Sequence, residues 1–305
     1  MTSSSSASEI DVKTATGRSM HGSGASGSVL RALWTLVVLT LRQHLHGKRW
    51  MIMAFLFLLP AGLAMLVRAT EKHALGVEVE FVFAFMFIPQ ALLPLVALVY
   101  ASGMIQDEQE EQTITYLLVR PIPKPAMYGA KLLATLITTV VLTIVFTCLT
   151  YVAIYIGAES KPEDVILRSL RAASIHALAV IAYCCLFGLM SLFTKRTLIA
   201  GIIYAAVFEG LLANLPFGIR LITVIYYARL IAYRTMKFIL PTPGRAQNIA
   251  AEAWNLDIRL DPRLLEHPQQ ATCFAVLLLG SLILALLAAF LCSRREFHVK
   301  TPQAS

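Results

Sequence analysis

Hydrophobic runs dominate the chain and are separated by shorter polar segments. Six of these runs are long enough, at about 20 residues in helical form, to cross the hydrocarbon core of a bilayer. They cover residues 50–67, 81–103, 126–157, 172–193, 197–215 and 271–292. A barrel strand would instead alternate apolar and polar positions over about ten residues. The pattern therefore predicts an all-α integral membrane protein, with six transmembrane helices in a domain covering residues 50–293.

Two different patterns precede the first run. Residues 1–28 are rich in Ser, Gly, Thr and Ala and are too poor in apolar residues to offset the entropy of ordering, which predicts a disordered tail. Residues 29–49 predict an amphipathic helix lying in the membrane interface, with a tilted spanning helix as the alternative. At 100° per residue its polar side chains share one narrow arc. They are Arg31, Thr35, Arg42 and His46.

The stretch between the fifth and sixth runs, residues 216–270, predicts a long outer loop. Its first part is apolar, but Arg220, Arg229 and Arg234 interrupt it too often for comfortable spanning. We expect an apolar helix that lies on or dips into the outer leaflet. If this segment spans instead, the C-terminus changes sides.

The distribution of Lys and Arg predicts the orientation. With an inside N-terminus, the inner segments carry fourteen of these residues and the two short outer loops carry five. Positive residues favour the cytoplasmic side, so both termini are expected there, including a tail at residues 294–305. This pattern predicts a multi-pass protein of the cell membrane.

Composition narrows the function classes. The chain has 305 residues, is 57% hydrophobic and only 14% charged, and has a formal net charge of +8. A soluble domain needs more charge on its surface. No nucleic-acid motif accompanies the positive charge, so we expect the basic residues to meet lipid headgroups instead. The five cysteines all fall within apolar runs, which predicts no disulfide and no metal site.

The sequence contains no catalytic constellation. It lacks H-E-x-x-H, G-x-S-x-G and the phosphate-binding G-x-x-x-x-G-K-[ST] pattern. An intramembrane enzyme would need paired catalytic groups on facing helices, and none is evident. We therefore expect no enzyme and no bound cofactor on this chain.

Glu209 is the one acid well inside an apolar run. An unpaired carboxylate there costs at least ~2.5 kcal/mol, so such residues usually face a bundle interior or a water-filled path. Glu209 is thus a candidate for the translocation path. The alternative is an interfacial acid paired with an arginine of the next loop, such as Arg220.

The segment at residues 104–125 predicts an inner hairpin. Four acids follow the second run, a short apolar stretch comes next, and prolines then force an extended chain. This arrangement would present an acidic, partly apolar helix to a cytoplasmic partner. A solvated turn is the alternative. The acids are Asp107, Glu108, Glu110 and Glu111.

This hairpin resembles the signature of ABC-2-type transport permeases. That family has an acid, then Glu-x-Gly-Thr, Leu-Leu, an Arg-Pro turn and a Lys between its second and third spans. The matching residues here are Glu108, Glu111, Thr113, Leu117, Leu118, Arg120, Pro121 and Lys131. Gln112 and Lys124 depart from the family, which usually has Gly and often has Arg there. The wider pattern extends the resemblance to residues 29–295.

The resemblance implies a function as well as a fold. Two permease subunits, identical or different, would form the path. Two cytoplasmic ATPases would dock on the inner hairpin, through the residues just named, and on the amphipathic helix of residues 29–49. ATP and Mg would be bound by the ATPases, and export is the usual direction. A secondary transporter or channel remains an alternative reading of the sequence, as does a non-transporting scaffold or sensor associated with an ABC ATPase.

Overall fold

The computed structural model describes residues 23–70, 76–110, 123–157, 161–194, 196–215, 218–242, 245–254, 256 and 267–294. Within these ranges six helical segments are long and apolar enough to cross a membrane, which confirms the predicted six spans. The spans are α2 (Lys48–Thr70), α3 to α4 (Gly76–Met104), α6 (Lys124–Tyr155), α7 (Pro162–Phe193), α8 to η3 (Thr197–Asn214) and α11 (Gln270–Arg294).

Two of these spans contain π-helical turns. The second joins α3 (Gly76–Glu80) to α4 (Leu93–Glu110) through η1 (Phe81–Leu92). The fifth joins α8 (Thr197–Tyr204) to the 3₁₀ turn η3 (Leu212–Asn214) through η2 (Ala205–Leu211). Such turns are rare in proteins, and they often occur at functional sites.

The remaining elements lie before the first span and between the last two. They are α1 (Ser23–His46), η4 (Gly218–Ile222), α9 (Val224–Met236), β1 (Ile239–Thr242), β2 (Arg245–Asn248) and α10 (Ile249–Ala253). The strands form an antiparallel hairpin in which Ile239 pairs with Asn248. The fold is otherwise helical across the described residues, as predicted.

Several helices begin earlier than the sequence pattern suggested, and two of them begin earlier by six residues or more. The fourth span starts at Pro162 rather than at residue 172, because Pro162 occupies the first turn with Glu163 and Asp164, all favourable at a helix N-terminus. Helix α1 starts at Ser23, so the expected disordered tail of residues 1–28 is too long at its end. The rest of that tail, residues 1–22, and the expected tail after Arg294 lie outside the described residues.

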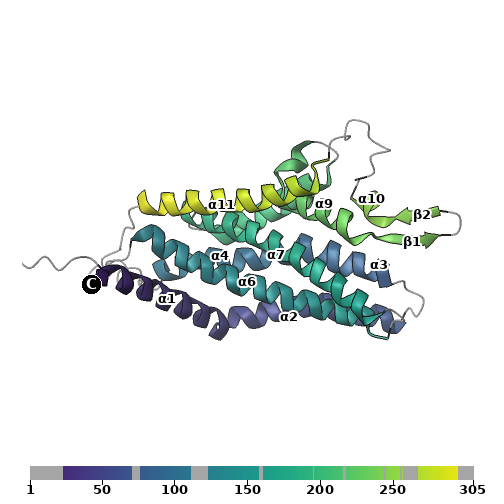
Figure 1. The fold of residues 1–305 in the computed structure, drawn as a ribbon, viewed down its shortest axis with the longest axis horizontal. Helices are drawn as coiled ribbons and strands as arrows, with labels where there is room; N and C mark the ends of the chain where they lie inside the picture. Colours follow the sequence, from purple (N-terminus) through teal and green to yellow (C-terminus); the bar gives the residue numbers. More distant parts are fainter. Residues whose placement is uncertain are drawn as a thin grey trace, which may run out of the picture.

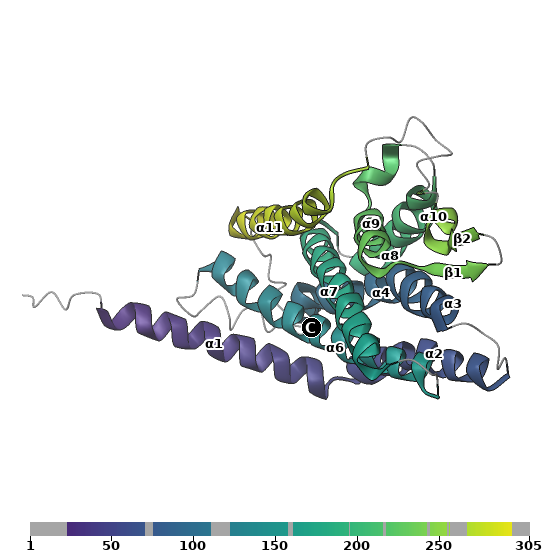
Figure 2. The same cartoon turned by 45° about the vertical axis from the view of Figure 1, so that its right-hand side comes forward.

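The helices run roughly along one long axis, and α7 lies in the middle of the bundle (Figure 1). It contacts α4, α6, α9 and α11. Figure 2 shows α11 and α9 on one side of α7, and α6, α1 and α2 on the other. The central helix thus links most of the other elements.

The two ends of the bundle are chemically distinct. At one end, which we call the Lys131 end, the last turns of α4, α7 and α11 pack on the first turns of α6 through Met104, Tyr128, Leu192 and Cys292. Helix α1 adds to this end, because its Leu36 and Val37 pack against the beginning of α6. The first and last described helices thus both pack against the beginning of α6 at this end.

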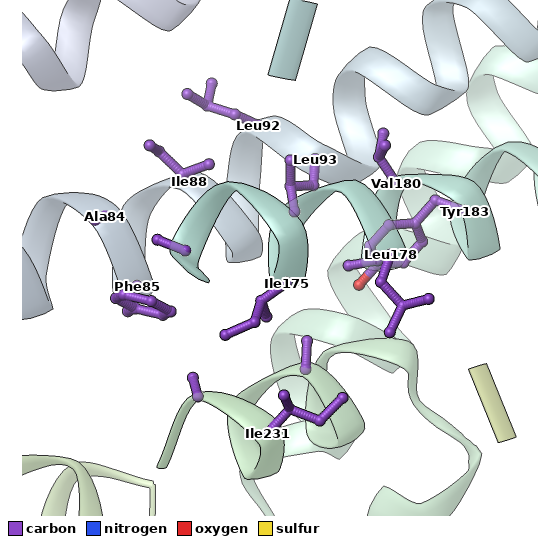
Figure 3. Close-up of a cluster of buried hydrophobic side chains, with 14 of the residues drawn as sticks. Ala84, Phe85, Ile88, Leu92, Leu93, Ile175, Leu178, Val180, Tyr183 and Ile231 are labelled. Carbon is purple, nitrogen blue, oxygen red and sulfur yellow. The ribbon is translucent and has the colours of Figure 1, made fainter. Parts of the chain in front are cut away.

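The core lies where η1 and α4, α7 and α9 meet (Figure 3). Because lipid tails are as apolar as leucine, close packing and polar contacts hold such helices together more than exclusion from water does. The core side chains include Ala84, Phe85, Ile88, Leu92, Leu93, Ile175, Leu178, Val180, Tyr183 and Ile231.

Helix α9 is an apolar helix in the segment expected to lie on or dip into the outer leaflet, and its position in the leaflet stays a prediction. It packs into the bundle against α7, α11 and η1, and its residues Ile225 to Ala232 are buried. With 13 residues, or about 20 Å, it is too short to span. Two of the three arginines in this segment, Arg220 and Arg229, are buried, whereas Arg234 is exposed. The hairpin and α10 follow, and Phe238 and Trp254 pack on Phe81.

Helix α1 has the amphipathic character expected of residues 29–49. Its predicted polar arc is exposed, while Leu36, Val37 and Thr40 on another face are buried. It lies along the beginning of α6, and Gly47 separates it from α2 (Figure 1). The apolar side chains Leu30 and Trp34 remain exposed. Whether the helix lies in the membrane interface stays a prediction.

Candidate functional site

Lys131 joins two spans at the Lys131 end. Its side chain is 3% exposed, and its Nζ donates to the carbonyl oxygen of Met104 at 3.0 Å. This bond connects α6 to α4 shortly before the latter helix ends at Glu110. Burial of an ammonium group is costly unless it is hydrogen-bonded. Lys131 therefore fixes the position of the α4 end, which carries the acids of the predicted hairpin.

The other predicted hairpin residues are only partly placed. Glu108 lies in the last turns of α4, which continues as helix to Glu110 beyond the second span, and that span ends at Met104 close to the expected Gly103. The remaining candidates, Glu111, Thr113, Leu117, Leu118, Arg120 and Pro121, lie outside the described residues. Their role in docking an ATPase stays a prediction.

A row of polar side chains runs along α6 from this end to the other. Polar residues recur at every fourth position, about 6 Å apart along the helix. All are buried except the last, which is partly so. We call this row the α6 ridge. It consists of Lys131, Thr135, Thr139, Thr143, Thr147, Tyr151 and Tyr155.

The middle of the α6 ridge makes few side-chain hydrogen bonds to α7. Thr139 Oγ1 lies 3.4 Å from Cys184 Sγ, and Thr147 Oγ1 lies 3.1 Å from His176 Nδ1. The hydroxyls of Thr135 and Thr143 have no hydrogen-bond partner. Hydrogen bonds between membrane helices average only about 0.6 kcal/mol. The centre of the α6–α7 contact thus contains buried polar side chains but few hydrogen bonds between the two helices.

The ridge ends in a buried ionic cluster, which marks the Glu80 end of the bundle. Glu80 is fully buried, and Arg168 of α7 binds its carboxylate through Nε and Nη2, each at 3.0 Å. Tyr151 donates to the same carboxylate at 2.7 Å, and Tyr155 donates to its other oxygen. Bidentate guanidinium pairs are strong and geometrically specific. The second, third and fourth spans are therefore fixed to one another here.

Glu209 is fully buried in η2 and holds the start of α9. Its carboxylate accepts from the backbone N–H groups of Val224 at 3.1 Å and Ile225 at 2.9 Å, and from the Tyr204 hydroxyl at 3.0 Å. A helix N-terminus favours a negative charge. The expected alternative of a pair with Arg220 is wrong, because that guanidinium lies over the ring of Tyr226.

Arg229 lies close to this carboxylate without pairing with it. The guanidinium is 5% exposed, donates to Asn214 Oδ1 and Gln90 Oε1 at 2.8 Å each, and lies 5.8 Å from the Trp254 ring centre. Its Nε has no partner. Burial lowers the pKa of Arg229 from its ordinary value, which nearby Glu209 opposes. Both π-helical segments, η1 and η2, thus border one buried polar cluster.

The predicted site residues are therefore divided between two places. Lys131 lies at one end of the α6 ridge, whereas Glu209 lies beside α9. The sequence reasoning missed Glu80, Arg168 and Arg229 as cluster members. A signal for the ridge was available in the four-residue period that starts at Lys131.

The buried polar groups described above come from several helices, and they were also compared with metal sites. Among the described residues, no group of three His, Cys, Asp or Glu side chains lies close enough to hold a metal ion. The polar groups instead connect helices to one another.

Comparison with known proteins identifies the family. A search among curated proteins found no match. The family model for ABC-2 family transporter proteins matches residues 44–212, which include the α6 ridge, Glu80 and Glu209. This range covers more than half of the 305 residues. Together with the six apolar spans, it shows that this multi-pass membrane protein belongs to the ABC-2 family of transporters.

Proposed function

We propose that the chain is the permease subunit of an ABC exporter and that a separate cytoplasmic ATPase drives it. Two such subunits, identical or different, would enclose the path within the lipid bilayer. ATP and Mg would be bound and used by the ATPase, and this chain would supply no catalytic group. The family match over residues 44–212 supports the permease assignment.

The coupling step would begin at the Lys131 end. We place this end, both termini and the hairpin of residues 104–125 in the cytoplasm, in agreement with the charge distribution. An ATPase docked on Glu108, Glu111, Thr113, Leu117, Leu118, Arg120 and Pro121 would displace the end of α4. The observation that carries the proposal is the bond from Lys131 to Met104, because it transmits such a displacement to α6.

The α6 ridge supports a motion of α6 relative to α7. The centre of the contact has weak hydrogen bonds and unpartnered hydroxyls, whereas the Glu80 cluster fixes the far end. A displacement at the Lys131 end would therefore tilt α6 about its fixed end. Rocking of this kind is a common way to open one side of a transporter. We place Glu209 beside the path as the anchor of α9.

Co-purification of the tagged full-length chain with its ABC ATPase tests the coupling site. We expect Leu117→Asp to remove the ATPase while the chain stays in the membrane, because each docked leucine contributes roughly 1.5–3 kcal/mol. Glu108→Lys should weaken docking less, and more at low salt.

The matched control is Glu163→Lys, an exposed acid at the start of α7, at the opposite end of the bundle. It should leave recovery of the ATPase unchanged. Full recovery of the ATPase with Leu117→Asp would show that docking occurs elsewhere. Robust ATP hydrolysis by the purified chain alone would contradict the proposal that a separate ATPase subunit hydrolyses ATP.

Labelling of single cysteines tests the orientation. Residues 75, 161 and 260 should react with an impermeant reagent added outside, whereas residue 110 should react only after the membrane is opened. The native cysteines lie in apolar helices and four of the five are buried, which keeps the background low. Labelling of residue 110 from outside would overturn the placement of the hairpin.

A further inference from the structure

The strands β1 and β2 and the helix α10 form a unit that is hydrogen-bonded within itself. The two strands pair with each other, and the N–H group of Ile249, at the start of α10, donates to the carbonyl oxygen of Phe238 at 3.1 Å. We call this unit, residues 238–242 and 245–254, the β1–α10 segment. It lies at the Glu80 end of the bundle, where β1 contacts α3 (Figure 1).

Aromatic rings attach the β1–α10 segment to η1. The Phe238 ring packs edge-on against Phe81 and Phe85, with centroid distances of 5.3 Å and 5.0 Å. The Trp254 ring lies 5.0 Å from that of Phe81, and its Nε1 donates to Met86 Sδ at 3.3 Å. Because a thioether sulfur is a weak acceptor, the rings supply most of this contact. All four rings are at most 6% exposed, so the segment covers this part of η1.

The chain enters the β1–α10 segment through a strained turn. Lys237 ends α9 with a φ of 46° and a ψ of 77°, which lies in the left-handed region. A residue other than glycine is disfavoured there, and such strain often lies at clamps and switch regions. Phe238, directly after the turn, is fully buried, whereas Ile239 is exposed. Hinges consist of a few residues at the ends of elements, which is the position that Lys237 occupies.

The same rings connect the β1–α10 segment to the α6 ridge. Phe85 contacts Phe238 on one side and His176 of α7 on the other, where the ring centroids are 5.4 Å apart. His176 Nδ1 in turn lies 3.1 Å from Thr147 Oγ1 of α6. Buried side chains are closely packed, so a displacement of one shifts its neighbours. A tilt of α6 would therefore disturb the rings that hold the segment on η1.

We propose that the β1–α10 segment is a lid, hinged at Lys237 and closed on η1 by the rings of Phe238 and Trp254. Because its backbone hydrogen bonds lie within the segment, it can leave η1 without breaking them. Opening would expose Phe81 and Phe85 at the Glu80 end. That α6 drives this opening rests on the proposed function, whereas the hinged lid itself does not.

Three alanine-to-cysteine variants test the lid, because cysteine is only slightly larger than alanine. Ala250 is fully buried on α10, Ala253 is exposed on the same helix, and Ala232 is fully buried on α9. Each variant would be reacted with a polar maleimide in nanodiscs, where the reagent reaches both faces of the membrane, and the unsubstituted chain gives the background. We expect Ala253→Cys to react fastest. Ala250→Cys should react about tenfold or more faster than Ala232→Cys, because local opening needs less free energy than global unfolding.

Phe238→Ala should release the lid. Labelling of Ala250→Cys should then rise about tenfold or more, because loss of a buried ring weakens the contact with η1. Labelling of Ala232→Cys should stay unchanged in the same background. The matched control is Ile239→Ala, which truncates the exposed next residue and should leave all rates as they are. Addition of the ABC ATPase with ATP should also accelerate labelling of Ala250→Cys.

In the chain without Phe238→Ala, labelling of Ala250→Cys as slow as that of Ala232→Cys would overturn the lid. This comparison holds even if Phe238→Ala fails to fold. Equal labelling of Ala250→Cys in Phe238→Ala and Ile239→Ala would also overturn it, as would a parallel rise in labelling of Ala232→Cys. If Phe238→Ala accelerates labelling and ATP does not, the lid stands and the drive by α6 is excluded.

Discussion

The Nζ atom of Lys131 lies 3.0 Å from the carbonyl oxygen of Met104, 27 residues earlier in the chain. This contact joins the third span to the second at the point where the second is about to leave the bundle. A lysine near the start of a membrane helix usually extends its charge toward the lipid headgroups. Here the side chain turns inward and contacts the backbone of another helix instead.

Loss of this contact should free the end of α4. We expect Lys131→Met to raise amide hydrogen exchange at residues 104–110 and to lower the free energy of unfolding by about 1–3 kcal/mol. Mass-spectrometric hydrogen exchange in nanodiscs is the measurement. Lys161→Met, an exposed lysine at the other end of the bundle, serves as the control. Unchanged exchange at residues 104–110 would mean that Lys131 does not position α4.

The ion pair between Glu80 and Arg168 should be important for stability. Glu80→Gln leaves the guanidinium without its anion, and breaking a buried pair costs up to about 3–5 kcal/mol. We expect a loss of ~2 kcal/mol or more, since Arg168 is still a quarter exposed. Thermal unfolding in detergent measures it. Glu78→Gln, an exposed acid two residues away, should have little effect, and equal losses in the two variants would contradict the prediction.

Two threonines of the α6 ridge should respond oppositely to removal of the hydroxyl. Thr143→Val removes a buried hydroxyl that has no partner, so stability should stay the same or rise slightly. Thr147→Val removes the hydrogen-bond partner of His176 Nδ1 and should cost about 0.6 kcal/mol, with an upper bound of about 1.7 kcal/mol. Both side chains are fully buried on the same helix, so each controls for the other. Equal unfolding temperatures for the two variants would exclude this difference.

Glu209 should tolerate loss of its charge better than reversal of it. Glu209→Gln retains an acceptor oxygen for the N–H groups that start α9, so expression and membrane insertion should persist. Glu209→Lys places a cation at a helix N-terminus beside Arg229, and we expect loss of folded protein. Fluorescence-detected size-exclusion chromatography compares the yields. A wild-type yield of Glu209→Lys would show that the carboxylate does not anchor α9.

The sequence predicts the spans well because each carries a long apolar run of its own. It does not show how α9 packs against the other helices. Gln90, which accepts a hydrogen bond from Arg229, is 139 residues away in the chain, so no local pattern shows that this cation finds a partner inside the bundle. Glu209 was recognised as unusual, yet its backbone partners in α9 cannot be inferred from residue types.

Glu80 shows the same limit in a different way. An acid at the edge of an apolar run looks like an ordinary interfacial residue, and only the fold reveals that two tyrosines and an arginine surround it. The α6 ridge could have been predicted from the sequence, because its polar residues recur at every fourth position. The high hydropathy of the segment indicated only a membrane span.

The separation of Glu80 and Arg168 along the chain also has a consequence for biosynthesis. The ribosome must add 88 more residues after Glu80 before Arg168 exists, which takes about 4–18 s at 5–20 residues per second. During this interval the carboxylate lacks its cation. A nascent chain that stops before Arg168 would keep an uncompensated acid at the edge of an apolar helix. Membrane quality-control proteases would then be able to distinguish it from the folded protein by this unpaired acid.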